Sequence, residues 1–396
     1  MTHSIETLLT KPCVQALFSV LAPLPTRLVG GCVRDALIGV DNPDIDVAVA
    51  APPPDIVKTL IDQGIKVMPT GIKFGTITAI IDHHPFQITS LRCDLDSKGR
   101  HPQVKFSTDW LQDAKRRDFT LNAIYLDNQG NVYDPFDGVE DLMKGKVRFI
   151  GDAKQRLQED YLRILRYYRF LAWFGREPYE TVPALRTLRL KLKSLSLERI
   201  QGELLKLLAA KDPRPAVSFM KNDGILEALW DHSLAITYFE KLVAFEEACS
   251  IPGLALRRLG ALCYPLANTI PGFFHTYFRL SSVQSRFLKN IIDTAKQEDR
   301  RWILYHHGPA FYQDWCLLRA ALTNESVILE ADLKWAKNQP PLILPITGQD
   351  IIAQGLPPGP SIGKLLKECE KWWMDHDFQP DRQACLEYCL SIKKAP

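Results

Sequence analysis

The sequence lacks the features that would place it in a membrane or in a secreted class. No apolar run approaches the roughly 20 residues that cross a bilayer. The first residues, MTHSIETLLT, have neither the basic and apolar regions of a secretion signal nor the arginine-rich start of a transit peptide. The nine cysteines form no CxxC pair and indicate reduced thiols. We therefore expect a cytoplasmic protein with no membrane span.

A strong excess of either charge is also missing. The 49 Lys and Arg residues oppose 46 Asp and Glu residues, which leaves a net charge of +3. This balance permits a local RNA-binding patch but does not argue for one by itself. No internal repeat or low-complexity segment is present. With 396 residues, 46% of them hydrophobic, the chain has a globular composition and the length for two or three modules.

Short strands and helices alternate in the first 150 residues, whereas helical patterns dominate after Asp152. We expect strands at 26–29, 45–50, 123–126 and 147–150, a hairpin of 75–82 with 86–92, and helices at 31–38, 54–63, 109–115, 158–174, 197–210 and 361–374. The pattern predicts an α+β fold, in which a head with a small mixed β-sheet and flanking helices precedes an all-α neck, body and tail.

Two carboxylates lie at the entry of the second strand. Asp44-Ile45-Asp46 leads into the apolar run VAVA, and residues two apart in an extended chain point to the same side. Close carboxylates repel, and a hard divalent cation is their usual neutraliser. An Asx-type turn at a strand entry is the plainer interpretation of such a pair taken alone.

The segment that precedes the carboxylates favours the catalytic interpretation. Gly30-Gly31 follows a strand and opens a helix, a pattern that permits close backbone approach to a phosphate. Arg34 would add a charge-assisted contact to the same phosphate group. The double glycine, the arginine and the carboxylate pair fall within the seventeen residues from Gly30 to Asp46.

Arginines recur in two later segments. Lys115-Arg116-Arg117 is followed by Asp118, which would hold an arginine in place, although a solvated helix face gives the same pattern. In the second segment, Arg163, Arg166 and Arg169 are spaced three apart along an otherwise apolar helix. Buried guanidinium groups need anionic partners. Internal salt bridges to the two neighbouring carboxylates are one solution, and a triphosphate would supply the missing negative charge.

The pair Asp160 and Arg163 offers a way to select a base without a template. A carboxylate accepts from the exocyclic amine of cytosine or adenine, and an arginine donates to the ring acceptor beside it. Guanine and uracil present an N–H and a carbonyl at those places, so both mismatch. The pair therefore predicts a preference for CTP and ATP.

These motifs resemble those of class II tRNA nucleotidyltransferases (CCA-adding enzymes), which share a superfamily with bacterial poly(A) polymerases. The matching stretches read LVGGCVRDALIG, DIDVAV, ITSLRCDLDSKGR, DAKRRDFTLNAIYLD, YDPFDGVEDLMKGKVRFIG, QEDYLRILRYYRF and LSLERIQGELLKLL. The segment LPITGQDIIAQGLPPGPSIGKLLKECEKWW also looks like the bacterial C-terminal region of the family.

The resemblance implies a nucleotidyltransferase head at 1–138, a nucleotide-recognising neck at 139–212 and a tRNA-binding body and tail at 213–396. It implies that Asp44 and Asp46 are catalytic and bind two Mg²⁺ ions. The substrates would be CTP, ATP and the 3′ acceptor end of tRNA, with no obligate protein partner. The nucleotide-binding residues would be Gly30, Gly31, Arg34, Arg117, Asp160, Arg163, Arg166 and Arg169.

Some features depart from the family pattern. The loop after Arg92 reads Lys98-Gly99-Arg100 where the family has DGR, and this loop helps the family to switch from CTP to ATP. Asp94 is a candidate for a supplementary carboxylate near the metals, and the basic stretch 186–193 is a candidate tRNA contact or an ordinary solvated face.

The alternatives to CCA addition are an enzyme that adds only the terminal A, a poly(A) polymerase, and a catalytically inactive RNA-binding relative.

Overall fold

The computed structural model describes residues 2–94, 104–176, 182–232, 234–323, 326–338 and 342–393. The chain forms two compact units. The first contains residues 1–234 together with 277–279, and the second contains 235–276 and 280–396. Each unit has hydrophobic clusters of its own.

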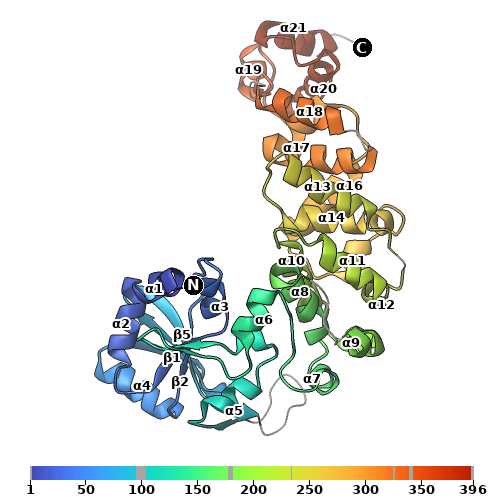
Figure 1. The fold of residues 1–396 in the computed structure, drawn as a ribbon. Coiled ribbons are helices and arrows are strands. Elements are labelled where there is room, and N and C mark those ends of the chain that lie inside the picture. Colours follow the sequence, from blue (N-terminus) through green and yellow to red (C-terminus); the bar gives the residue numbers. More distant parts are fainter. Residues whose placement is uncertain are drawn as a thin grey trace. The chain divides into compact units, whose positions relative to one another are not determined.

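A seven-stranded mixed sheet forms the centre of the head (Figure 1), in the strand order β3-β4-β5-β2-β1-β8-β9. Strands β2 and β5 run parallel, and the other neighbours run antiparallel. The strands are β1 (Thr26–Val29), β2 (Asp46–Val49), β3 (Lys66–Gly71), β4 (Thr76–Ile81), β5 (His84–Ser90), β8 (Tyr125–Leu126) and β9 (Val132–Tyr133). A separate ribbon pairs β6 (Arg92–Asp94) with β7 (Val104–Phe106).

Both faces of this sheet are covered, because successive side chains of a strand point to opposite faces. Leu28 of β1 belongs to the larger hydrophobic cluster, to which α1 (Thr2–Leu9), α2 (Pro12–Val20), α3 (Gly31–Leu37) and α4 (Pro53–Asp62) contribute. Val29 belongs to a smaller cluster on the other face, together with Ala114 of α5 (Trp110–Lys115). The apolar residues of the short strands therefore hold the sheet between two layers.

The rest of the first unit is helical. Its helices are α6 (Gly138–Lys144), α7 (Ala153–Glu159), α8 (Arg163–Phe174), α9 (Val182–Leu188), α10 (Leu197–Leu208), α11 (Arg214–Asn222) and α12 (Ile225–Trp230), with a 3-10 turn at Arg189–Ser194. Two other 3-10 turns, Ile72–Phe74 and Thr120–Asn122, lie in the head. Helix α8 packs against α10 and α11. Tyr167 and Tyr168 of α8 are fully buried, and the Tyr168 hydroxyl donates to Asp223 Oδ2 at 2.6 Å.

The second unit consists of helices in the part that the structure describes. They are α13 (Thr237–Ala248), α14 (Ala255–Ala267), α15 (Phe273–Tyr277, whose last residue falls in the first unit), α16 (Ser282–Thr294), α17 (Arg300–Thr323, kinked at Gly308), α18 (Ser326–Lys337), α19 (Gly348–Ala353), α20 (Pro360–Asp375) and α21 (Arg382–Lys393). In the described ranges, no helix combines the length and the apolar character that crossing a membrane requires.

Most expected elements are present, and three expectations were wrong in detail. The segment 147–150 forms no strand, because Phe149 makes only an isolated bridge to Phe119 outside the sheet. The hairpin turns at Asp82 and His83, both with positive φ, and not at 83–85. The expected helix 158–174 is two helices, α7 and α8, as described next.

Helix α7 ends at Glu159 because Asp160 adopts an extended conformation, with φ −152° and ψ 107°. The Asp160 Oδ1 accepts a hydrogen bond from the Leu162 amide at 3.1 Å, and such local side-chain bonds compete with helix formation. Helix α8 then starts at Arg163. Asp160 and Arg163 are consequently not two residues of one helix, and the break sets the direction of each side chain separately.

Candidate active site

The register of the sheet brings the double glycine and the carboxylate pair to the same edge. Strands β1 and β2 are antiparallel with Leu28 opposite Val47, so the residues after β1 lie beside those that precede β2. Gly30 has φ +75°, which a residue with a side chain rarely adopts, and its amide donates to the Ile124 carbonyl at 3.1 Å. The turn that was expected to face a phosphate therefore lies next to the expected metal ligands.

The carboxylate pair has the predicted alternation. Ile45 is buried at 4% exposure, whereas Asp44 and Asp46 on either side of it are exposed. The Asp44 amide donates to Asn42 Oδ1 at 2.9 Å. Loss of hydration raises the pKa of Asp46 above its usual value, and the neighbouring Asp44 adds to this rise. Both effects disfavour the ionised form of Asp46.

Arg117 is the cation that opposes this charge, since it lowers the pKa of Asp46. Its Nη2 donates to Asp113 Oδ2 at 3.1 Å, and its Nε donates to the Tyr125 hydroxyl at 3.1 Å. Its Nη1 would lie 3.6 Å from a Cβ built on Gly30. Strand β8 and helix α5 thus hold Arg117 beside both the glycine turn and the carboxylates.

The donor set at this edge fits a hard divalent cation that also binds a substrate. In the described ranges, no three His, Cys, Asp or Glu side chains are grouped closely enough to hold a metal by themselves. Mg²⁺ is commonly bound through one or two carboxylates, with phosphate oxygens and water completing its octahedral shell. Two exposed aspartates beside the glycine turn match that mode.

Arg34 lies inside the head and not on its surface. Its Nε donates to Asp35 Oδ1 at 2.8 Å and its Nη1 donates to Asn122 Oδ1 at 2.7 Å. Its guanidinium lies 4.2 Å from the centre of the Phe174 ring of α8. Burial lowers the pKa of Arg34, which Asp35 opposes. In this structure Arg34 therefore connects α3 to the neck.

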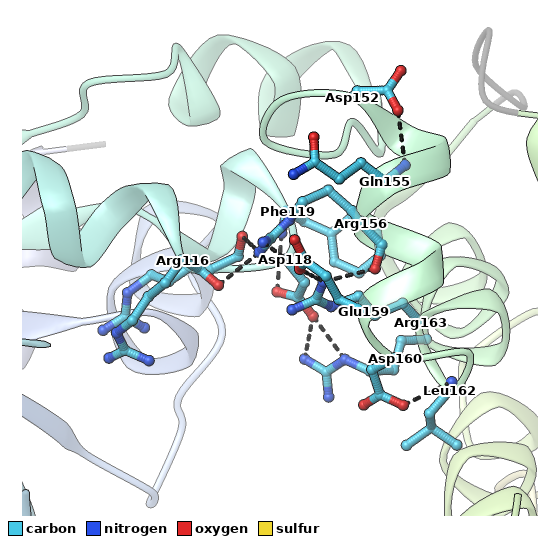
Figure 2. Close-up of polar contacts among 12 residues, drawn as sticks. Arg116, Asp118, Phe119, Asp152, Gln155, Arg156, Glu159, Asp160, Leu162 and Arg163 are labelled. Atoms are coloured by element: carbon cyan, nitrogen blue, oxygen red, sulfur yellow. Dashed lines mark hydrogen bonds and ion pairs between the residues drawn. The ribbon is translucent and has the colours of Figure 1, made fainter. Parts of the chain in front are cut away.

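The two residues expected to read the base have separate partners, and Figure 2 shows those of Arg163. The Asp160 Oδ2 accepts from Arg199 Nη2 of α10 at 2.7 Å. The Nη1 of Arg163 donates to the Arg156 carbonyl at 2.7 Å and also to Glu159 Oε2. The structure places Asp160 and Arg163 on adjacent helix ends, each held by a different internal contact.

The expectation that the α8 arginines outnumber their carboxylates was wrong. The Asp118 Oδ2 accepts from Arg166 Nε at 2.7 Å, and Glu203 Oε2 of α10 lies 3.2 Å from Arg169 Nε. Asp118 and Glu203 are 9% and 6% exposed. These two carboxylates come from segments distant in sequence, so the neighbouring residues of α8 do not reveal them.

A continuous set of hydrogen bonds links the carboxylate pair to α8. Asn42 Nδ2 donates to Asp35 Oδ2 at 2.7 Å, and Asp35 accepts from Arg34. Arg34 donates to Asn122, whose Nδ2 donates to Asp118 Oδ1 at 3.0 Å. Since the Asp44 amide donates to Asn42 and Asp118 accepts from Arg166, the network runs from the loop of the carboxylate pair to the neck.

Sequence reasoning missed Asn42, Arg156, Arg199 and Glu203. Arg199 and Glu203 are four apart in the quoted stretch LSLERIQGELLKLL, and opposite charges at that spacing lie on one helix face. This spacing is visible in the sequence, but it does not identify the residues with which Arg199 and Glu203 pair. Lys98, Gly99 and Arg100 lie outside the described residues, and the side chain of Asp94 is not described either.

Comparison with known proteins agrees with this arrangement. Residues 26–148 match the family model of the poly A polymerase head domain, and residues 178–232 match the probable RNA and SrmB-binding site of polymerase A. Among solved structures, the chain is similar to Bacillus stearothermophilus CCA-adding enzyme in complex with CTP, with a TM-score of 0.76, 24% identity and coverage of 97% of this chain and 98% of that one. This likeness shows the fold, an α+β head followed by helices.

Similarity in sequence extends over nearly the whole chain. The mitochondrial CCA tRNA nucleotidyltransferase 1 of Homo sapiens is 32% identical over 388 residues, which are 93% of this chain and 86% of the relative. The CCA-adding enzyme of Lactobacillus johnsonii is 29% identical over 399 residues, with 91% and 92% covered. The chain therefore belongs to the family of CCA tRNA nucleotidyltransferases, also called CCA-adding enzymes.

Proposed function

We propose that this nucleotidyltransferase adds CMP and AMP, taken from CTP and ATP, to the 3′ end of tRNA and so builds or repairs the CCA terminus. The observation that carries the proposal is the convergence of the glycine turn, Asp44, Asp46 and Arg117 at one edge of the head. The neck is tied to this edge through Asp118 and Arg166. We retain the division into a head (1–138), a neck (139–212) and a tRNA-binding body and tail (213–396).

Asp44 and Asp46 are the proposed catalytic residues and would hold divalent cations, which we take to be two Mg²⁺ ions. When bound, such ions favour ionisation of the attacking tRNA hydroxyl and neutralise charge on the departing pyrophosphate. The exposure of both carboxylates beside the glycine turn supports this assignment, because it leaves their oxygens accessible to a cation and to a phosphate.

Gly30, Gly31, Arg34 and Arg117 are the proposed contacts of the triphosphate. Gly30 and Gly31 leave room for phosphate oxygens, and Arg117 supplies the adjacent positive charge. Arg34 would act through its bonds to Asp35 and Asn122, which fix the helix that begins at the turn. The tRNA 3′ oxygen then bonds to the α-phosphorus as the bond to pyrophosphate breaks, without a covalent intermediate on the protein.

Asp160 and Arg163 are the proposed base-reading pair, with Arg166 and Arg169 as further nucleotide contacts. Asp160 accepts from the exocyclic amine of cytosine or adenine, and Arg163 donates to the adjacent ring nitrogen. Within the described chain Nη1 is the only side-chain nitrogen of Arg163 that donates a hydrogen bond, so its Nε and Nη2 remain for a base.

We also propose a cytoplasmic location and no obligate protein partner. All nine cysteines are free, which fits a reducing compartment.

The deciding experiment is extension of labelled tRNA on a gel. Substrates that end before the CCA and substrates that end in CC are incubated with Mg²⁺ and each NTP, singly and together. Three added nucleotides with CTP plus ATP, followed by a stop, support the proposal. A single A on the CC-ended tRNA alone identifies an A-adding enzyme, a long A tail identifies a poly(A) polymerase, and no incorporation identifies an inactive RNA-binding relative.

Base reading has its own test in Arg163→Ala. The change removes the donor to the ring acceptor, so we expect the preference for CTP over UTP in kcat/KM to fall by about tenfold to a hundredfold. Steady-state rates with each NTP on the same tRNA measure it. An unaltered preference would remove Arg163 from base selection.

A further inference from the structure

Arg156 of α7 joins the neck to the end of helix α5. Its Nη2 donates to the main-chain oxygens of Arg116 and Arg117, both at 2.6 Å. These carbonyls follow the last turn of α5, where a helix leaves C=O groups without intrahelical partners. Arg156 therefore fixes the backbone from which the Arg117 side chain extends toward Gly30.

The same residue also holds the base-reading end of the neck. Its Nη1 donates to Glu159 Oε2 at 2.5 Å, and its own carbonyl accepts from Arg163 Nη1 at 2.7 Å. Glu159 Oε2 accepts from Arg163 as well, so one carboxylate oxygen binds two guanidinium groups (Figure 2). The side chains of Arg156, Glu159 and Arg163 are 11%, 11% and 16% exposed, so water competes little for these bonds.

Charge in this cluster is unevenly balanced. Burial lowers the pKa of Arg156, the Arg163 cation lowers it further, and Glu159 opposes both. In the described chain the Nε of Arg156 is buried without a hydrogen-bond partner. Arg156 and Arg163 donate to the same oxygen of Glu159. If Arg163 moves toward another acceptor, Arg156 no longer shares that oxygen and its own bond to Glu159 changes.

We propose that Arg156 is a positioning residue that couples base selection at Arg163 to placement of the triphosphate by Arg117. The inference rests on the proposed function, since it requires that Arg163 reads the base and that Arg117 contacts the phosphates. Arg156 itself touches neither part of the nucleotide. It acts through Glu159 on one side and through the carbonyls of Arg116 and Arg117 on the other.

This coupling predicts that a mismatched base slows the chemical step. When cytosine or adenine accepts from the remaining Arg163 donors, the guanidinium turns toward the base and its Nη1 moves away from Glu159, which leaves the Glu159 oxygen to Arg156 and steadies the Arg117 backbone. Uracil or guanine offers no such acceptor beside an amine, so Arg163 stays on Glu159 and the triphosphate is less well aligned. Part of the discrimination between CTP and UTP then appears in kcat and not only in KM.

The test compares Arg156→Met with the wild-type enzyme in single-nucleotide addition to tRNA. We expect kcat with CTP to fall by about tenfold while KM for CTP changes by less than about threefold. With UTP, kcat should hardly change, so the CTP-to-UTP ratio of kcat should fall by about tenfold. Loss of packing alone would lower the melting temperature but would not change this ratio.

Two variants control the experiment. Arg148→Met removes an arginine that likewise binds a carboxylate, Asp141, and a carbonyl, that of Phe136, but does not touch Glu159 or Arg163. It should keep the wild-type ratio. Arg156→Lys keeps the charge beside Glu159 without the planar fork, so it should recover thermal stability but not the ratio. Arg156→Lys also tests the coupling if Arg156→Met does not fold.

The outcomes separate the two proposals. A wild-type enzyme that adds no nucleotide refutes the proposed function. An active, selective wild type whose CTP-to-UTP ratio of kcat is unaltered in both Arg156 variants refutes the coupling alone. An equal fall of the ratio in Arg148→Met also overturns the coupling, because the loss of any partly buried arginine would then have the same effect.

Discussion

At the scale of the residue, Asp46 is exposed, but neighbouring protein atoms remove part of the hydration of its carboxyl group. This loss and the nearby Asp44 raise its pKa above that of an ordinary aspartate. Asp46→Asn removes the charge with little change of shape. We expect incorporation of CMP and AMP to fall by about a thousandfold, as the loss of several kcal/mol of transition-state stabilisation implies. The gel assay measures this rate.

The matched control is Asp41→Asn, an exposed aspartate of the same loop that pairs with Lys11 at 2.5 Å. It should keep the wild-type rate, and both variants should keep the wild-type melting temperature. Retained incorporation in Asp46→Asn would end the assignment of Asp46 as a metal ligand.

The pKa of Asp118 is lowered, in contrast to the raised pKa of Asp46. Burial alone would raise its pKa, but the Arg166 cation and the Asn122 amide hold it at about 2. The ionised form is thus favoured by folding, and its stabilisation is present above the unfolded pKa of about 3.8 and is lost as pH falls toward 2. Asp118→Asn should lower the free energy of unfolding by about 2 kcal/mol at pH 7.

Urea unfolding at several pH values measures this contribution. The difference between wild type and Asp118→Asn should narrow as pH falls below about 4, where Asp118 takes up a proton in the unfolded chain. A difference that stays constant with pH would mean that the ion pair with Arg166 does not cause it.

At the scale of the element, helix α10 carries two charged residues, four apart, that pair with residues at α7 and α8. Glu203 is buried beside Arg169, and Arg199 reaches the half-exposed Asp160. Glu203→Gln removes a buried anion from the partly buried Arg166 and Arg169 and should destabilise the fold by about 3 kcal/mol. Arg199→Met should cost less than about 1 kcal/mol, because its ion pair is partly exposed.

The two changes should separate stability from selectivity. Arg199→Met frees the Asp160 carboxylate, so we expect a weaker preference for CTP over UTP in an enzyme of nearly normal melting temperature. The two measurements are chemical unfolding and the ratio of kcat/KM for the two nucleotides. The reverse pattern, in which Glu203→Gln is stable and Arg199→Met unfolds, would contradict this division of roles.

Local patterns predicted elements better than they predicted breaks and distant partners. The alternation around Ile45 predicted strand β2, and the double glycine predicted the start of helix α3; the structure contains both elements. The break at Asp160 depends on a side-chain bond to the Leu162 amide that competes with a helical one, and apolar spacing does not record it. The partners of Arg166 and Arg169 come from 48 and 34 residues away in sequence (166 − 118 and 203 − 169), so only the fold identifies them.

At the scale of the whole molecule, the net charge of +3 is too small for general attraction to RNA. In the basic stretch 186–193, Arg186 pairs with Asp223 at 2.7 Å and Lys193 pairs with Asp231. Lys191 is exposed, and within the described chain it has no ion-pair partner. We therefore expect Lys191, more than its neighbours, to contact a tRNA phosphate.

The salt dependence of tRNA binding tests this expectation. Lys191→Ala should reduce the slope of log K against log salt concentration by about 1. Lys144→Ala, which removes an exposed lysine paired with Glu140, should leave the slope unaltered. Equal slopes in all three proteins would exclude Lys191 from the phosphate contacts.

The bonds from Arg156 to the end of α5 reach main-chain oxygens. Every amino acid carries the same carbonyl, so this link is indifferent to which side chain occupies position 116. Homologous enzymes can therefore diverge at position 116 and still keep the two halves of the nucleotide site in register. At position 156 few substitutions would be tolerated, because only a long, forked donor spans both carbonyls and Glu159. This contact therefore restricts the amino acid at position 156 and not the one at position 116.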